Sequence, residues 1–110
     1  MKRSSTSEPL PFVIEDSLTA LGRRISLVRR AKGITQSDLA AQAGISLSTM
    51  LSIEKGAATV QIGFVLKTLW ALGLEDTFKS LEAFGSDREL LMLMADAVPG
   101  TVVESRRRRT

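Results

Sequence analysis

The stretch "ITQSDLAAQAGISLSTMLSIEKG", residues 34–56, decides the fold. Thr35 predicts the N-cap of a helix, because a threonine hydroxyl there accepts a hydrogen bond from a free backbone amide. Gly44 predicts the end of that helix, since glycine adopts the left-handed conformation that ends many helices. Ser46 and Gly56 predict the limits of a second helix in the same way. The stretch therefore predicts two short helices joined by a tight turn.

The two helices meet through only Gly44 and Ile45, so they must cross at a steep angle, which is the geometry of a helix-turn-helix. Ala40 is small enough to let the next helix approach. Met50 and Ile53 are predicted to form the buried side of the second helix. The predicted structural residues of the unit are Ala40, Gly44, Met50 and Ile53.

The flanking sequence predicts one helix before this unit and one directly after it. The first begins at Asp16 or Ser17 and is stopped by Gly33, whereas the other is capped by Thr59 and stopped by Gly73. Apolar residues recur at helical steps in both. They are Leu18, Leu21, Ile25 and Val28 in the first helix, and Ile62, Val65, Leu66, Leu69 and Leu72 in the second.

Two more helices are predicted towards the C-terminus. A short one covers about 75–84, with Phe78 and Leu81 turned inward, and "SDRE" at 86–89 has the spacing of a capping box ahead of a final helix. The short "TVV" run at 101–103 could pair as a strand, but three residues do not establish one. The fold class is predicted to be all-α, as a compact domain of five to six helices.

Composition divides the chain into four predicted segments. Ser, Thr, Glu and proline at the N-terminus cannot bury enough surface to offset the entropy of ordering, so this segment is predicted to be a disordered arm. The segments are the arm at 1–15, the helix-turn-helix domain at 16–84, a C-terminal helix for dimer or partner contact at 85–98, and a basic tail at 99–110.

Charge is unevenly distributed. Residues 1–59 hold 8 basic and 5 acidic side chains, residues 60–105 hold 3 and 7, and Arg106 to Arg109 add four positive charges. This asymmetry suggests that the first half faces phosphate and the second half faces something else. A scatter of solvated charges is the alternative.

The sequence lacks residue types that several classes of function usually need. It contains no Cys and no His, which removes thiol nucleophiles, disulfides, zinc fingers and the imidazole base. We therefore expect no enzyme, no catalytic residues, no metal site and no cofactor. The sequence has no apolar run long enough for a signal peptide or a membrane span, so a cytoplasmic, nucleoid-associated protein is expected.

The central stretch resembles the DNA-binding unit of the lambda-repressor-like, or xenobiotic-response-element (XRE) type, helix-turn-helix regulators. The resemblance extends from about Leu18 to Leu74. The residues that match together are Thr35, Gln36, Leu39, Ala40, Gly44, Ser46, Ile53, Glu54 and Gly56. It implies a sequence-specific repressor that binds double-stranded DNA as a homodimer.

The resemblance also implies roles for individual residues. Gln36 would contact a phosphate and brace the recognition helix, while Ser46 and Thr49 would contact backbone phosphates. For Ser46, a helix cap is an equally good interpretation. Leu47, Ser48 and Ser52 would occupy the face that reads bases. The full DNA-binding set predicted in this way is Arg29, Gln36, Ser46, Leu47, Ser48, Thr49, Ser52 and Lys55.

Two leucines depart from the family pattern. Leu47 stands where many members have glutamine or another polar residue, so it can offer only apolar contact, best matched by a thymine methyl. Leu51 stands where a small polar residue is usual. Both could instead pack on a neighbouring segment or partner, which would make the chain a protein-interaction module with a degenerate helix-turn-helix.

Beyond Gly73, "LWALGLEDTFKSLEAF" and the arginine-ended tail resemble the small HipB-like antitoxins encoded beside HipA-type kinase toxins. This resemblance implies autorepression of a toxin–antitoxin operon and binding to a HipA-like kinase toxin. A stand-alone phage-type repressor without a toxin would share all the residues named so far.

Overall fold

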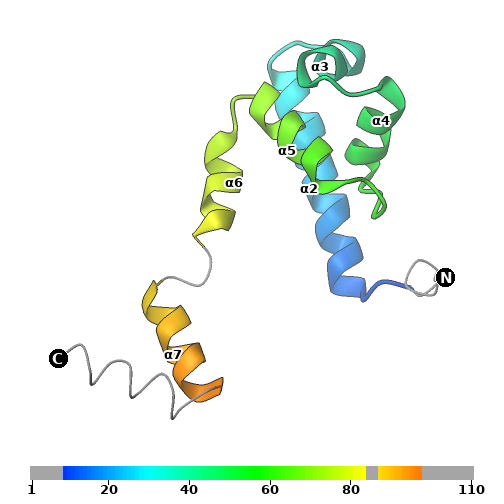
Figure 1. The fold of residues 1–110 in the computed structure, drawn as a ribbon. Helices are drawn as coiled ribbons and strands as arrows, with labels where there is room; N and C mark the ends of the chain where they lie inside the picture. The colour runs from blue at the N-terminus through cyan, green and yellow to red at the C-terminus, as the bar shows by residue number, and fades with distance from the viewer. Residues whose placement is uncertain (1–8, 84–86, 98–110) are drawn as a thin grey trace. The chain divides into compact units, whose positions relative to one another are not determined.

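The computed structural model describes residues 9–83 and 87–97, and its regular elements in these ranges are all helices (Figure 1). They are α2 (Phe12–Ala31), α3 (Gln36–Ala43), α4 (Leu47–Lys55), α5 (Ile62–Ala71), α6 (Glu75–Glu82) and α7 (Asp87–Ala97). This confirms the predicted all-α fold. None of the helices in the described ranges is long and apolar enough to cross a membrane.

The chain forms two compact units, Met1–Phe78 and Lys79–Thr110. Among the described residues, the buried core belongs to the first unit, and α6 and α7 contain no buried residue. The core is built from Ile25, Leu39, Ala40, Met50, Ile53, Leu69 and Leu72, contributed by α2 to α5 and the residue that follows α5. The helix-turn-helix and its two flanking helices therefore share one hydrophobic core.

The predicted limits of α3 and α4 are confirmed. Thr35 Oγ1 accepts a hydrogen bond from the Asp38 amide at 3.0 Å, and Ser46 Oγ accepts one from the Thr49 amide at 3.0 Å. Gly44 and Gly56 end these helices with φ values of 71° and 80°, the left-handed region that a side chain makes costly. Both helices are thus capped at each end by the residues that the sequence singles out.

The starts of α2 and α5 differ from the prediction. α2 begins at Phe12 rather than at Asp16 or Ser17, because Pro11 takes the N-cap position with its φ fixed near −54° and its carbonyl accepts the amides of Ile14 and Glu15. Part of the predicted arm is therefore helical. The arm residues 1–8, Ser86 of the capping box and the segment 98–110 lie outside the described residues.

The cap of α5 is Gln61 rather than Thr59, and its side chain makes no capping hydrogen bond. Thr59 lies in a turn, and Val60 packs against the core before the helix starts. In α6, Phe78 packs partly against the core as predicted, but Leu81 is 58% exposed. The prediction that Leu81 faces inward is wrong, because the first unit and its core end at Phe78.

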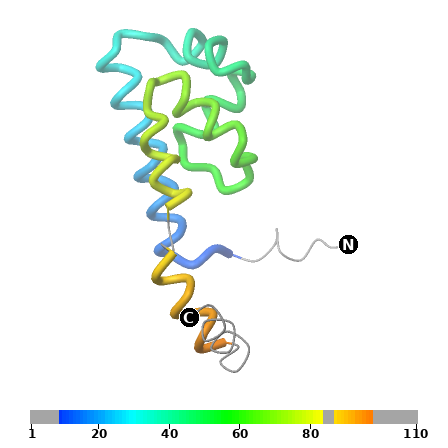
Figure 2. The backbone as a smooth tube through the Cα atoms, turned by 60° about the vertical axis from the view of Figure 1, so that its left-hand side comes forward, coloured from blue at the N-terminus to red at the C-terminus, as the bar shows by residue number. Residues whose placement is uncertain are grey.

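The long α2 packs closely on α4, and α3 packs on both α4 and α5 (Figures 1 and 2). A Cβ atom on Gly22 would lie 2.6 Å from the carbonyl oxygens of both Ile53 and Glu54. A Cβ atom on Gly56 would lie 2.8 Å from the Leu18 carbonyl oxygen. Only glycine allows this approach, so two glycines set the position of α4 on α2.

Candidate nucleic-acid interface

The candidate recognition helix is α4, which divides into an inner and an outer side. Met50 and Ile53, predicted to be buried, are 0% and 5% exposed and pack in the core. Ser48 is exposed, while Thr49 and Ser52 are half-buried. The outer side therefore presents short hydroxyl side chains, which can donate to and accept from the edges of bases or phosphate oxygens.

Leu47 and Leu51 are also on the outer side of α4, with 43% and 36% of their surface exposed. Neither side chain is buried in the core, so both remain available to a ligand. This exposure is compatible with both interpretations drawn from the sequence, contact with a thymine methyl and contact with another protein.

A hollow of about 260 Å³ lies between α4 and the start of α5. Ser48, Thr49 and Ser52 line it from α4. Thr59 and Gln61 line it from the residues before α5. Thr59 and Gln61 were not predicted as site residues, because Thr59 was interpreted only as a helix cap. A signal was available: both are polar, and both lie just before the helix that follows the recognition helix.

The ion pair of Arg29 and Glu54 holds α2 to α4 from within. Arg29 Nε donates to Glu54 Oε2 at 2.7 Å, and Arg29 Nη2 donates to Glu54 Oε1 at 3.1 Å. The third nitrogen of the guanidinium, Nη1, donates to the Ile34 carbonyl at 3.0 Å. The two side chains of the ion pair are 9% and 6% exposed.

Arg29 was included in the predicted DNA-binding set, but the structure commits its guanidinium to intramolecular partners. Because each of its three nitrogens already donates to Glu54 or Ile34 and the side chain is buried, Arg29 is not among the DNA contacts that we propose below. The arginine instead fixes the helix that carries the outer hydroxyls.

Gln36, the first residue of α3, joins this network. Its side-chain amide Nε2 donates to Glu54 Oε1 at 2.9 Å, so α2, α3 and α4 meet at one carboxylate. Burial alone raises the pKa of Glu54, but the hydrogen bonds from Arg29 and Gln36, with the positive charge of Arg29, outweigh it and hold this pKa below its ordinary value. Glu54 is therefore ionised when the network is formed.

The remaining predicted contacts lie around α4. The hydroxyl of Ser46 caps α4 and also donates to Thr49 Oγ1 at 2.9 Å, so both interpretations of Ser46 stay compatible with its position. Lys55 is exposed in the last turn of α4. Ala40 is 3% exposed beneath the turn that Gly44 makes between α3 and α4.

Comparison with known proteins supplies two findings. A family model described as "Helix-turn-helix domain" matches residues 20–77. The chain is also 38% identical, over 53 residues, to an uncharacterized HTH-type transcriptional regulator, y4mF, of Sinorhizobium fredii. That match covers 48% of this chain and 70% of the relative. No solved structure matches the chain significantly.

Proposed function

The chain belongs to the helix-turn-helix domain family, and from this premise we propose that it is a sequence-specific DNA-binding transcriptional repressor of the XRE type. The observation that carries the proposal is the outer side of α4, where Ser48 and Ser52 stand on a helix fixed from behind by Arg29, Glu54 and Gln36. A reading helix must be held rigidly so that its hydroxyls meet bases in register.

In the proposed complex, α4 enters the major groove. Ser48 and Ser52 read base edges, and Leu47 contacts a thymine methyl. The contacts to phosphate come from Gln36, Ser46, Thr49 and Lys55. Gln36 has two tasks in this proposal, because its Nε2 carries two N–H groups: one donates to Glu54 Oε1, and the other would donate to a phosphate oxygen at the start of α3.

We propose that the repressor binds as a homodimer, with the segment 85–98, which contains α7, as a dimer or partner contact. Five large apolar side chains of α7 support this role, since 42–62% of their surface is exposed: Leu90, Leu91, Met92, Leu93 and Met94. Exposed apolar clusters of this kind mark protein contacts. A Leu91→Asp or Leu93→Asp substitution is expected to give monomers that retain the helical circular dichroism spectrum, and a dimer that survives both would argue against this contact.

DNA footprinting tests the repressor itself. A two-fold dimer should protect a palindrome whose half-site centres lie about one helical turn, roughly 10 base pairs, apart. Protection of one unrepeated half-site by a monomer would contradict the proposed dimeric mode. Protection of no sequence above background would contradict sequence-specific binding.

The finer proposal is that this repressor is the antitoxin of a HipA-like toxin–antitoxin operon. It rests on the resemblance of the sequence after Gly73 and on the exposed apolar side chains of α7, which offer a contact to a protein partner. The test is co-expression with a kinase-like reading frame from the same operon. Co-purification and relief of toxicity are expected, whereas toxicity that persists without complex formation would leave a stand-alone repressor.

A second candidate function is favoured by Leu47 and Leu51, whose exposure on the outer side of α4 also suits a protein-interaction module. The two candidates differ in a simple measurement. Substituting both leucines by serine should relax DNA specificity only at the base pair that Leu47 contacts in a repressor, because the thymine-methyl contact is lost while Ser48 and Ser52 remain. It should abolish partner binding in an interaction module.

A further inference from the structure

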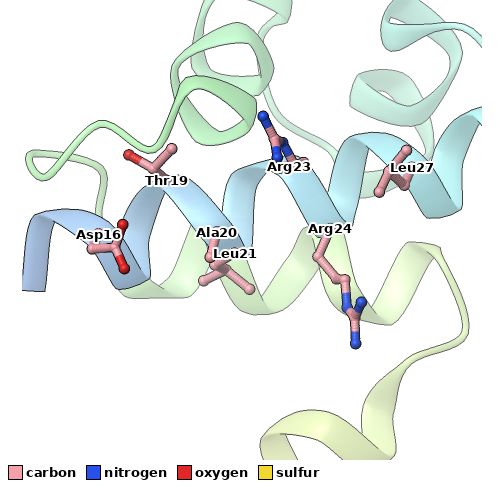
Figure 3. A pocket seen from close by; sticks show the side chains of 7 residues that line it. All are labelled: Asp16, Thr19, Ala20, Leu21, Arg23, Arg24 and Leu27. Carbon is pink, nitrogen blue, oxygen red and sulfur yellow. The ribbon is translucent and has the colours of Figure 1, made fainter. Parts of the chain in front are cut away.

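α2 carries a second apolar face that the core does not use. Val13, Ala20 and Leu27 follow one another at seven-residue steps, and Val13 and Leu27 are 69% and 51% exposed. A shallow hollow of about 670 Å³ runs along this face, lined by Asp16, Ala20, Leu21, Arg23, Arg24 and Leu27. Figure 3 shows Ala20 near the middle of this row, with Asp16 towards one end and Leu27 towards the other.

This face points away from the recognition helix. Gly22 is the point of α2 that touches the last carbonyls of α4. Because successive residues of an α-helix are about 100° apart, Ala20 lies about 160° around the helix from Gly22. A molecule bound at Ala20 would therefore leave α4 free for DNA.

We propose that this face binds the same face of a second copy of the chain, with the two α2 helices antiparallel and the two-fold axis at Ala20. Val13 precedes Ala20 by seven positions and Leu27 follows it by seven. Val13 of one copy would therefore lie opposite Leu27 of the second copy. Alanine at the centre lets the two helices approach closely. The apolar row is thus self-complementary in one orientation.

The charges beside the row favour that orientation. Asp16 and Arg23 lie on the same flank of the row, at about the same distance from Ala20 on opposite sides. A two-fold axis perpendicular to the helices brings like flanks together, so Asp16 would face the second copy's Arg23, and Arg23 the second copy's Asp16. In the part of the chain that the structure describes, neither side chain has an ion-pair partner of its own.

A parallel arrangement of the same face is unfavourable. It would bring Arg23 and Arg24 of both copies to one level, which gathers four positive charges without an acidic partner. The sequence of the face therefore selects the antiparallel pair over the parallel one.

The contact is small, because each copy contributes one face of one helix. Interfaces of this size form weak, concentration-dependent complexes. Since α4 stays free, the contact would join chains that are already bound to different DNA sites, where local concentration is high.

A charge exchange tests the pairing in the full chain, by sedimentation without DNA. Wild-type mass should rise with concentration. Asp16→Arg and Arg23→Asp should each lower the association constant at least about tenfold, since each leaves two like-charged contacts. An equimolar mixture of the two variants should restore association, because both contacts of the mixed pair are attractive.

The outcomes are decisive whether or not the C-terminal half adds its own dimer contact, because the variants change only α2. Equal association of wild type and both variants would overturn the proposal. So would a mixture that associates no better than its components. A mass that does not rise with concentration would also overturn the proposal, since the outer face of α2 would then not bind a second copy.

A cysteine substitution tests the position of the axis, because the natural chain has no cysteine. Ala20→Cys should form a disulfide-linked dimer on mild oxidation, since the two copies of this position meet at the axis. Arg30→Cys is the matched control on α2. Its two copies would lie about 30 Å apart along the antiparallel helices, at 1.5 Å per residue, so no disulfide is expected. Equal cross-linking at both positions would contradict the proposed register.

Discussion

The carboxylate of Glu54 accepts hydrogen bonds from both Nε and Nη2 of Arg29, at 2.7 Å and 3.1 Å, although 25 positions separate the two residues in sequence. The pair ties α2 to α4, and Gln36 adds α3 to the same carboxylate. A buried charge depends on its partner, because an unpaired charge away from water is strongly unfavourable. The orientation of the candidate recognition helix therefore depends on two side chains that are not expected to touch DNA.

Removal of one member of this pair should strongly destabilise the fold. We expect Glu54→Ala to lower the free energy of unfolding by about 3–5 kcal/mol, because it leaves the buried Arg29 unpaired. Urea denaturation measures the change. Glu82→Ala is the matched control, since the Lys79–Glu82 pair is 65% and 62% exposed and should contribute less than about 1 kcal/mol.

Stability should also depend on pH through Glu54. Its pKa is lower in the folded chain than the ordinary value of 4.5, so the folded state binds its proton less tightly than the unfolded state does. The stabilisation is therefore complete above pH 4.5 and is lost as the pH falls through the lowered pKa. Urea midpoints on acidification should fall more steeply for the wild type than for Glu54→Gln, and equal slopes would contradict this role.

Two glycine-to-alanine substitutions within helices are predicted to change the free energy of unfolding in opposite directions. Gly22→Ala should destabilise the fold by about 1–3 kcal/mol, because its Cβ would lie 2.6 Å from two α4 carbonyl oxygens. Gly63→Ala should stabilise it by about 0.5–1 kcal/mol, since Gly63 is helical and nothing lies within 4 Å of the added atom. Thermal unfolding of both variants compares the two signs directly.

The proposed base contacts predict a loss of specificity. Ser48→Asp and Ser52→Asp should each weaken operator binding at least about tenfold, because they add a negative charge in the groove. Gln36→Ala should weaken binding to all sequences more evenly, since phosphate contacts carry no sequence information. Thr77→Asp, an exposed position in α6, is the control for an added charge. Unchanged affinity in all three α3 and α4 variants would favour the interaction module.

The four arginines at 106–109 predict a salt effect, although they lie outside the described residues. Each arginine that neutralises a phosphate releases counterions, so deleting all four should reduce the slope of log affinity against log salt by up to about 3–4 per chain. Base preference should not change. An unchanged slope would show that these arginines do not touch DNA and would make an acidic partner protein the better interpretation.

Local signals allowed most of the helix-turn-helix to be predicted. Thr35, Gly44, Ser46 and Gly56 each act on their own turn of helix, so a single sequence is enough to place them. The start of α2 was missed because Pro11 can begin a helix as readily as it can break one.

The Arg29–Glu54 pair was missed for a different reason. No local pattern joins residues 25 positions apart. Arg29 also lies near Arg23, Arg24 and Arg30 in the sequence, and nothing in the sequence marks it as the buried arginine. The outer face of α2 was missed as well, because only one set of apolar residues was followed along this helix, and Val13, Ala20 and Leu27 do not belong to it. Only the packing of α2 on α4 separates the two faces.

The close packing of Gly22 and Gly56 on their neighbours has a thermodynamic consequence for ligand binding. Gly56 fixes the end of α4 against Leu18, and Gly22 leaves no room between α2 and the last carbonyls of α4. A helix held in this way loses little conformational entropy when it meets a ligand, because its backbone is ordered during folding. The heat-capacity change of binding should then arise from the buried surface alone, without a contribution from coupled folding.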